Sequence, residues 1–217
     1  MIKAVIFDMD GVIFDSERVI CELWDEVAKE NNIPDIEELM IRCIGINEKA
    51  TDELFTKKYG EEFPYEKFKK IISQRYHEKY DGGRLPMKPG VKELLSFLKE
   101  NGIKTALASS TNVRTVTNQL KDAGVLQFFD VVVGGDMVTR SKPDPEIFLH
   151  AAEMLGIDPK DAFIIEDSFN GIRAAHAAGA KPVMVPDLIQ PDDEIKALYH
   201  KNCRDLLEVR DYFSEFI

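Results

Sequence analysis

Short, unbroken apolar runs recur along this chain, and between most of them lie amphipathic segments that end at a glycine. A strand buried on both faces needs such a run, and glycine readily adopts the left-handed conformation that ends a helix. The predicted strands are residues 4–7, 105–108, 131–133, 162–165 and 182–185. The predicted helices are residues 91–101, 112–123, 145–155 and 169–178. This alternation predicts an α/β core built on a doubly wound, Rossmann-like parallel sheet.

Residues 16–84 interrupt the alternation. Helical periods of apolar residues are visible in this stretch, but no strand-like run is. We therefore predict an inserted all-helical domain over residues 16–84 and a discontinuous core domain made of residues 1–15 and 85–217. The adjacent glycines Gly82 and Gly83 would permit a hinge at one exit of the insertion.

The balance of charge limits the partners of the protein. The 217 residues include 28 basic and 39 acidic ones, a formal net charge of -11, and such a field repels nucleic acids and acidic membranes. The three cysteines form no CxxC pair, which fits a reducing compartment, and the apolar runs are too short for a signal peptide or a bilayer span. We expect a cytoplasmic monomer that binds neither nucleic acid nor membrane. An anionic substrate would need a lysine, a helix N-terminus or a divalent cation beside it.

Two acids follow the first predicted strand. Asp8 and Asp10 lie two residues apart, so in an extended segment they point to the same side, at the sheet edge where open parallel sheets bind ligands. Two acids that point into one pocket suggest a catalytic role. The alternative is a hairpin in which Asp10 and Gly11 form the turn and residues 12–14 return as a strand.

Polar residues also follow three of the other predicted strands. Ser109 begins the hydroxyl-rich loop of residues 109–112, which opens a helix and serves either as a plain N-cap or as an anion cradle made of a hydroxyl and free backbone amides. Lys142 is followed by Pro143 and Pro145, which stiffen the backbone around it, and is either solvated or aimed inward. Glu166 and Asp167 are adjacent carboxylates, whose repulsion a cation would relieve. Because each element ends a different strand, together they form the set that phosphoryl transfer through an aspartyl phosphate requires.

At these positions the sequence resembles the haloacid dehalogenase-like hydrolase superfamily, in the helical-cap branch that contains sugar-phosphate phosphatases and beta-phosphoglucomutases. The motifs are residues 7–12, 108–110, 141–145 and 165–168, and the resemblance covers essentially the whole chain. It implies that residues 16–84 are a cap that closes over the site and excludes water.

The resemblance also implies the catalytic roles. Asp8 would attack phosphorus, and Asp10 would protonate the leaving oxygen and then deprotonate the attacking water. Ser109 and Lys142 would hold the transferring phosphoryl oxygens. The acid at position 10 favours phosphate chemistry, because the dehalogenase members of the superfamily lack an acid there.

A magnesium site is implied in the same way. Mg2+ would be bound by Asp8, the backbone carbonyl of Asp10 and Asp167, with Glu166 adjacent or acting through water. Few protein ligands suit a cation that keeps several waters.

The substrate contacts decide between a phosphatase and a mutase. The candidate substrate-binding residues are Gly11, Glu48, Lys49, Ser110, Asn112 and Asn170. In an approximate alignment, a mutase has an arginine, a lysine and a histidine where this chain has Glu48, Asn112 and Ile20, although Lys49 or Arg114 could substitute. A glutamate repels a second phosphate. We therefore favour a phosphatase that acts on a small phosphorylated metabolite such as a sugar phosphate. The alternatives are a beta-phosphoglucomutase-type mutase, a pyrophosphatase in which Glu48 touches the metal, and a phospho-receiver signalling domain.

Overall fold

The fold is built on one parallel sheet. The computed structural model describes residues 2–46 and 48–217, and for Glu48 it describes the backbone alone. Among these residues six strands pair in the order β3-β2-β1-β4-β5-β6. They are β1 Ala4–Phe7, β2 Lys104–Ala108, β3 Val131–Val133, β4 Ala162–Glu166, β5 Lys181–Met184 and β6 Lys201–Asn202. The predicted α/β class is confirmed, and the one described strand that was not predicted, β6, is too short to form an apolar run.

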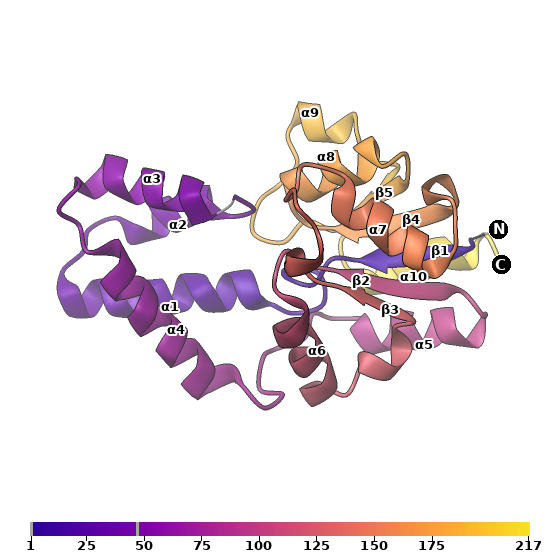
Figure 1. Ribbon diagram of the computed structural model, residues 1–217, viewed down its shortest axis with the longest axis horizontal. Helices are drawn as coiled ribbons and strands as arrows, with labels where there is room; N and C mark the ends of the chain where they lie inside the picture. Colours follow the sequence, from indigo (N-terminus) through magenta and orange to yellow (C-terminus); the bar gives the residue numbers. More distant parts are fainter. Residues whose placement is uncertain (1, 47) are drawn as a thin grey trace.

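Helices cover both faces of this sheet (Figure 1). The core helices are α5 Val91–Glu100, α6 Val113–Asp122, α7 Glu146–Leu155, α8 Phe169–Ala177, α9 Asp193–Lys196 and α10 Leu206–Ser214, with short 3-10 turns η1 Leu126–Phe128, η2 Gly135–Met137 and η3 Pro159–Asp161. Side chains alternate along β1: Val5 packs in the cluster that contains α5 and α10, and Ile6 packs in the cluster that contains α7. This alternation explains why the strand has to be apolar throughout.

Glycines end the predicted core helices as expected. Gly102, Gly124, Gly156 and Gly179 have φ angles between 65° and 75°. At the end of α7, the amide of Gly156 donates a hydrogen bond to the carbonyl of Ala152. The sequence signal therefore marked real helix ends.

A second group of helices lies beyond the carboxyl end of β1, at the left of Figure 1. It consists of α1 Ser16–Asn31, α2 Ile36–Cys43, α3 Glu48–Tyr59 and α4 Tyr65–Tyr80. Trp24, Phe55 and Tyr65 join three of these helices, with ring centroids 4.7 to 6.1 Å apart. The helical content matches the expectation for this stretch, while its division from the core at residues 16 and 84 stays a prediction.

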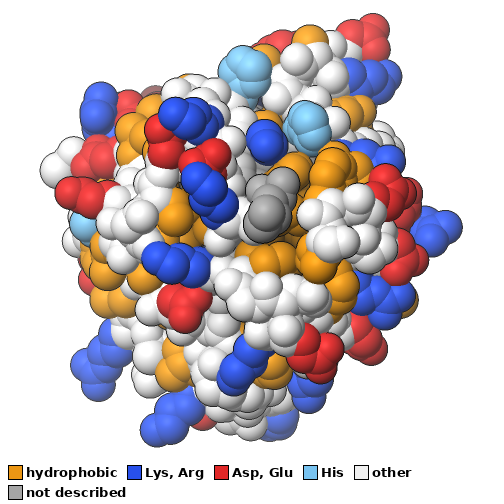
Figure 2. All heavy atoms as spheres, turned by 90° about the vertical axis from the view of Figure 1, so that its right-hand side faces the viewer, with side chains coloured by type: hydrophobic (Ala, Val, Ile, Leu, Met, Phe, Trp, Pro, Cys, Tyr) orange, Lys and Arg blue, Asp and Glu red, His pale blue; other side chains and the backbone are white. Residues whose placement is uncertain are grey.

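Three further observations concern the surface charges, the character of the helices and the cysteines. On the face that holds the chain ends, basic and acidic side chains are interspersed (Figure 2). Within the described residues no helix combines the length and the apolar character needed to cross a bilayer. The three cysteines are free thiols.

Candidate active site

The chain turns sharply after β1. Residues 11–13 form a turn in which the amide of Ile13 donates to the carbonyl of Met9 at 2.8 Å, and Phe14 then bridges to Met87. The hairpin alternative is therefore wrong, because β1 pairs with β2 and β4 instead. The turn leads the chain away from the sheet edge and into α1.

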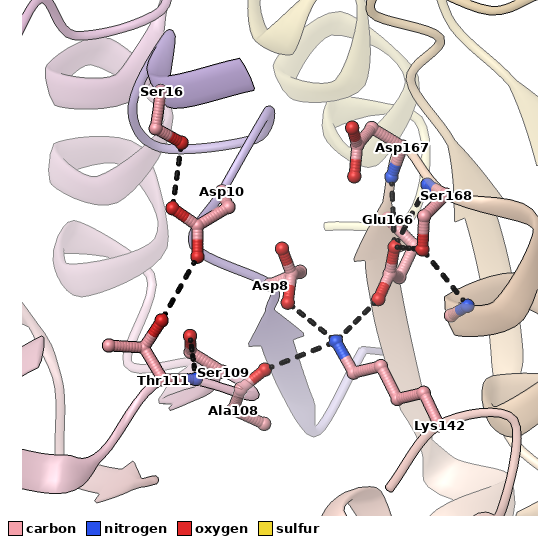
Figure 3. A network of polar contacts seen from close by, with 11 residues as sticks. Asp8, Asp10, Ser16, Ala108, Ser109, Thr111, Lys142, Glu166, Asp167 and Ser168 are labelled. Atoms are coloured by element: carbon pink, nitrogen blue, oxygen red, sulfur yellow. Dashed lines mark hydrogen bonds and ion pairs between the residues drawn. The ribbon is translucent and has the colours of Figure 1, made fainter. Parts of the chain in front are cut away.

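A buried lysine and two buried acids form the centre of the site (Figure 3). Lys142 Nζ lies 2.5 Å from Asp8 Oδ1 and 2.6 Å from Glu166 Oε1. The three side chains are 8%, 9% and 0% exposed. Burial by itself lowers the pKa of Lys142, but the charges of Asp8 and Glu166 outweigh it and leave that pKa raised, so the lysine is a fixed cation here.

Glu166 also holds the start of α8. Its Oε2 accepts hydrogen bonds from the amides of Asp167 and Ser168 and from the Ser168 hydroxyl, at 3.0 to 3.1 Å. Ser168 in turn caps the helix, since its Oγ accepts from the amide of Gly171 at 3.0 Å. With both oxygens engaged in this way, Glu166 fixes the position of Lys142.

Asp10 is held by different partners. Its Oδ1 accepts from the Ser16 hydroxyl at 2.7 Å, and its Oδ2 accepts from Thr111 Oγ1 at 3.5 Å, so that in Figure 3 its carboxylate is turned toward these two side chains. Burial raises the pKa of Asp10, and the hydrogen bond from Ser16 partly offsets this effect. A carboxyl with a raised pKa is suited to exchanging a proton.

Three carboxylates could hold a metal ion. Ligand atoms of Asp8, Glu166 and Asp167 lie within 4.8 Å of one another. Burial, followed by the neighbouring negative charge of Glu166, raises the pKa of Asp167 well above its usual value, and burial also raises that of Asp8. None of the described residues donates a hydrogen bond to the Asp167 carboxylate. One lysine against three buried acids leaves a negative excess that fits a divalent cation with oxygen ligands.

Gly11 lies against this cluster. Its φ of 79° lies in the left-handed region, and a Cβ at this position would come within 2.1 Å of Asp167 Oδ2. The absence of a side chain at Gly11 is therefore what leaves room for the Asp167 carboxylate.

A cavity of about 630 Å³ opens beside these groups. Its lining includes the candidate residues Asp8, Asp10, Ser110, Lys142, Asp167 and Asn170. Asn170 Nδ2 donates to the carbonyl of Gly45 at 2.7 Å and so ties α8 to the segment after α2.

Three further candidates, Ser109, Asn112 and Lys49, do not line this cavity. Ser109 is fully buried, and its Oγ accepts from the amide of Thr111 at 3.1 Å. Asn112 caps α6, because its Oδ1 accepts from the amide of Thr115 at 3.0 Å. Lys49 is exposed in α3 and is not part of the cavity lining. The side chain of Glu48 lies outside the described residues.

Sequence reasoning missed three residues of this site. Ser16 and Thr111 hold Asp10, and Glu17 lines the cavity. Thr111 belongs to the hydroxyl-rich loop 109–112, in which Ser109, Ser110 and Asn112 were predicted as site residues but Thr111 was not. For Ser16 and Glu17 the available signal was their position just after the first motif, where the chain enters α1.

The fold and the site define a hydrolase-type α/β protein in which buried acids and a lysine meet at one edge of a parallel sheet. A family model of haloacid dehalogenase-like hydrolases matches residues 2–179. The chain belongs to this family, as its motifs predict, and is an enzyme of that family.

Individual relatives agree with this assignment. Phosphorylated carbohydrates phosphatase of Thermotoga maritima is 36% identical over 181 residues, which make up 83% of this chain and 83% of that protein. Beta-phosphoglucomutase of Bacillus subtilis is 32% identical over 217 residues, covering 92% of this chain and 94% of that protein. The crystal structure of a haloacid dehalogenase family hydrolase from Deinococcus radiodurans, with bound phosphate and sodium, has a TM-score of 0.82, 26% identity, and covers 99% of this chain and 96% of that chain.

Proposed function

We propose that this protein is a Mg2+-dependent phosphatase that releases phosphate from a small phosphorylated carbohydrate through an aspartyl phosphate on Asp8. The observation that carries the proposal is the buried pairing of Asp8 with Lys142 and Glu166 beside Asp167, on the wall of a substrate-sized cavity. Relatives named as a carbohydrate phosphatase and as a hydrolase with bound phosphate support it.

The residues have distinct roles in this reaction. Asp8 attacks the phosphorus atom with the oxygen that faces the cavity, while Lys142 neutralises its charge and holds a phosphoryl oxygen. Asp10 gives a proton to the leaving oxygen and later takes one from the attacking water, for which its raised pKa is suited. Glu166 positions Lys142 and does not itself react. Ser109 would hold a phosphoryl oxygen together with Lys142, and its Oγ also accepts a hydrogen bond from the amide of Thr111.

A magnesium ion would be held by Asp8 and Asp167, the backbone carbonyl of Asp10, and Glu166 directly or through water. It would supply the positive charge that shields the phosphate from these acids. The carboxylates provide the hard oxygen ligands that this cation prefers.

A mutase is the second candidate, because a beta-phosphoglucomutase is among the relatives. A phosphosugar mutase must hold a second phosphate while the first is transferred, which requires a second cationic group. Among the cavity-lining side chains that the structure describes, Lys142 alone is basic. Both Lys49 and Arg114 are exposed and lie outside that lining. This distribution favours hydrolysis.

The test is a phosphate-release screen over sugar phosphates, nucleotides and pyrophosphate, with Mg2+ and with excess chelator. We expect release from a sugar phosphate that depends on Mg2+ and falls roughly a thousandfold or more in Asp8→Asn. Asp193→Asn, an exposed change in α9, should leave the rate unaltered. Full turnover by Asp8→Asn or in chelator would contradict the proposal.

Three readouts separate the alternatives. Phosphorus NMR follows beta-glucose 1-phosphate with a bisphosphate primer, and isomerisation faster than phosphate release would favour the mutase. Preference for pyrophosphate in the screen would favour a pyrophosphatase. An acylphosphate on Asp8 that persists for minutes without turnover would favour a signalling receiver.

A further inference from the structure

Glu17 is an acid of the cavity that the proposed chemistry does not use. It lies in the first turn of α1, seven residues after Asp10, and it lines the cavity together with Ile20 and Trp24 of the same helix. These α1 residues therefore face the part of a bound ester that does not react.

The carboxyl group of Glu17 differs from the other acids of α1 in lacking a partner. No described residue forms a hydrogen bond or an ion pair with it. The other acids of the helix are all paired with lysine or arginine: Glu22 with Arg18, Asp25 with Lys29, Glu26 with Lys79 and Glu30 with Arg75. Positions 20 and 21, three and four residues after Glu17, are isoleucine and cysteine, so α1 places no cation where it would pair with Glu17.

The surroundings of Glu17 are acidic and partly desolvated. Burial raises its pKa to about 7, and the neighbouring charges of Asp10 and Asp187 add to this effect. Lys88, which could offset the charge of Asp187, is already paired with that residue at 2.5 Å. Lys142 is likewise held by its own two acids. The groups around Glu17 thus leave its hydrogen-bonding capacity unused.

A ligand in the cavity can supply the missing partner. A hydroxyl both donates and accepts, so it can pair with a carboxyl group in either protonation state. A second phosphate would be repelled by a cavity that already contains Asp8, Asp10 and Asp167. The apolar side chains of Ile20 and Trp24 would pack against carbon atoms of the same ligand.

We propose that Glu17 is a specificity-determining residue, whose carboxyl group hydrogen-bonds a hydroxyl on the organic part of the substrate. It thereby selects polyhydroxylated monophosphates over bisphosphates and over esters without a free hydroxyl. This inference rests on the proposed function, because it requires a phosphate ester placed at Asp8.

The experiment compares wild-type protein with Glu17→Ala, Glu17→Gln and the control Glu22→Gln, which changes an exposed acid of the same helix. Each protein is assayed with Mg2+ on fructose 6-phosphate, sorbitol 6-phosphate, fructose 1,6-bisphosphate and p-nitrophenyl phosphate. The last ester has no hydroxyl beyond the phosphate. Thermal unfolding checks the fold, and we expect both Glu17 variants to be at least as stable as wild type, because Glu17 is a partly desolvated acid among other acids and has no described partner to lose.

We expect Glu17→Ala to raise KM for the two sugar monophosphates about tenfold or more, with kcat within about threefold of wild type. Its kinetics on p-nitrophenyl phosphate should stay unaltered. In Glu17→Gln, the bisphosphate should gain relative to fructose 6-phosphate, because a repelling charge is removed. The Glu22→Gln control should match wild type on every ester.

Two results would overturn the inference while leaving the proposed function intact. One is an unchanged KM for the sugar monophosphates in Glu17→Ala. The other is an equal loss on all esters, p-nitrophenyl phosphate included, which would mean that Glu17 supports the fold or the reacting groups. If wild-type protein releases phosphate from no ester at all, the proposed function fails and the inference fails with it.

Discussion

Replacing Gly171 by alanine should destabilise the protein, although helix propensity alone predicts the opposite. Gly171 lies in the first turn of α8, where alanine is normally better than glycine by about 1 kcal/mol. A Cβ at this position, however, would come within 1.8 Å of both Cδ and Oε1 of Glu166. Glu166 is fully buried, so its side chain has little room to move.

The size of the effect follows from what Glu166 holds. Its two oxygens accept four hydrogen bonds, one of them from the Lys142 ammonium. Removing one partner of a buried ion pair costs about 3–5 kcal/mol, of which the gain in helix propensity offsets about 1. We therefore expect a net loss of about 2–4 kcal/mol in the free energy of unfolding. For a chain of this length the corresponding drop in Tm is roughly 4–16 °C.

Activity should fall for the same reason. Displacing Glu166 lets Lys142 leave its position beside Asp8, and the loss of one preorganised charge in an active site costs roughly a hundredfold or more in kcat. Calorimetric unfolding measures the loss of stability in Gly171→Ala, and phosphate release with Mg2+ measures its loss of activity. As a matched test, the Tm penalty of Gly171→Ala should be smaller in a Glu166→Asp background, because the shorter side chain vacates the space. A variant as stable as wild type, with unchanged kcat, would refute the reasoning.

Two more predictions concern Gly11 and the loop that carries Lys142. Gly11→Ala should abolish most activity, because the new Cβ would collide with the Asp167 carboxylate. The control is Gly60→Ala, where φ is 91° and no described atom lies within 4 Å of the added Cβ, so this variant should lose stability through backbone strain but keep its activity. Equal activity of the two variants in the phosphate-release assay would contradict this prediction. Glu146 accepts hydrogen bonds from the Thr139 and Arg140 amides, which lower its pKa to about 2. Its folded pKa is below its unfolded one, so its stabilising effect is present above about pH 4.5 and is lost as the pH falls toward 2. Urea unfolding should therefore show Glu146→Gln to be less stable than wild type at pH 6, and the difference in the free energy of unfolding should be smaller at pH 3. A difference that is the same at both pH values would contradict the stabilising role of the Glu146 carboxylate.

Local patterns in the sequence determined much of the fold. Apolar runs predicted β1 to β5, and glycines such as Gly156 marked the helix ends, because burial periodicity and backbone freedom depend on residues close together in the chain. The same patterns placed Asp8, Lys142 and Glu166 at strand ends that share one edge of the sheet. The short strand β6 was not predicted, because its two polar residues show no pattern of alternating burial.

The partners within the site were decided by the tertiary structure. The contact between Lys142 and Asp8 joins residues 134 positions apart, and only the packing of the sheet brings them to 2.5 Å. Packing also determined that Lys49 stays outside the cavity, while Glu17 lines it without a partner among the described residues. A sequence specifies which side chains are available at each strand and helix end, but the charge that each one faces depends on distances that only the folded chain defines.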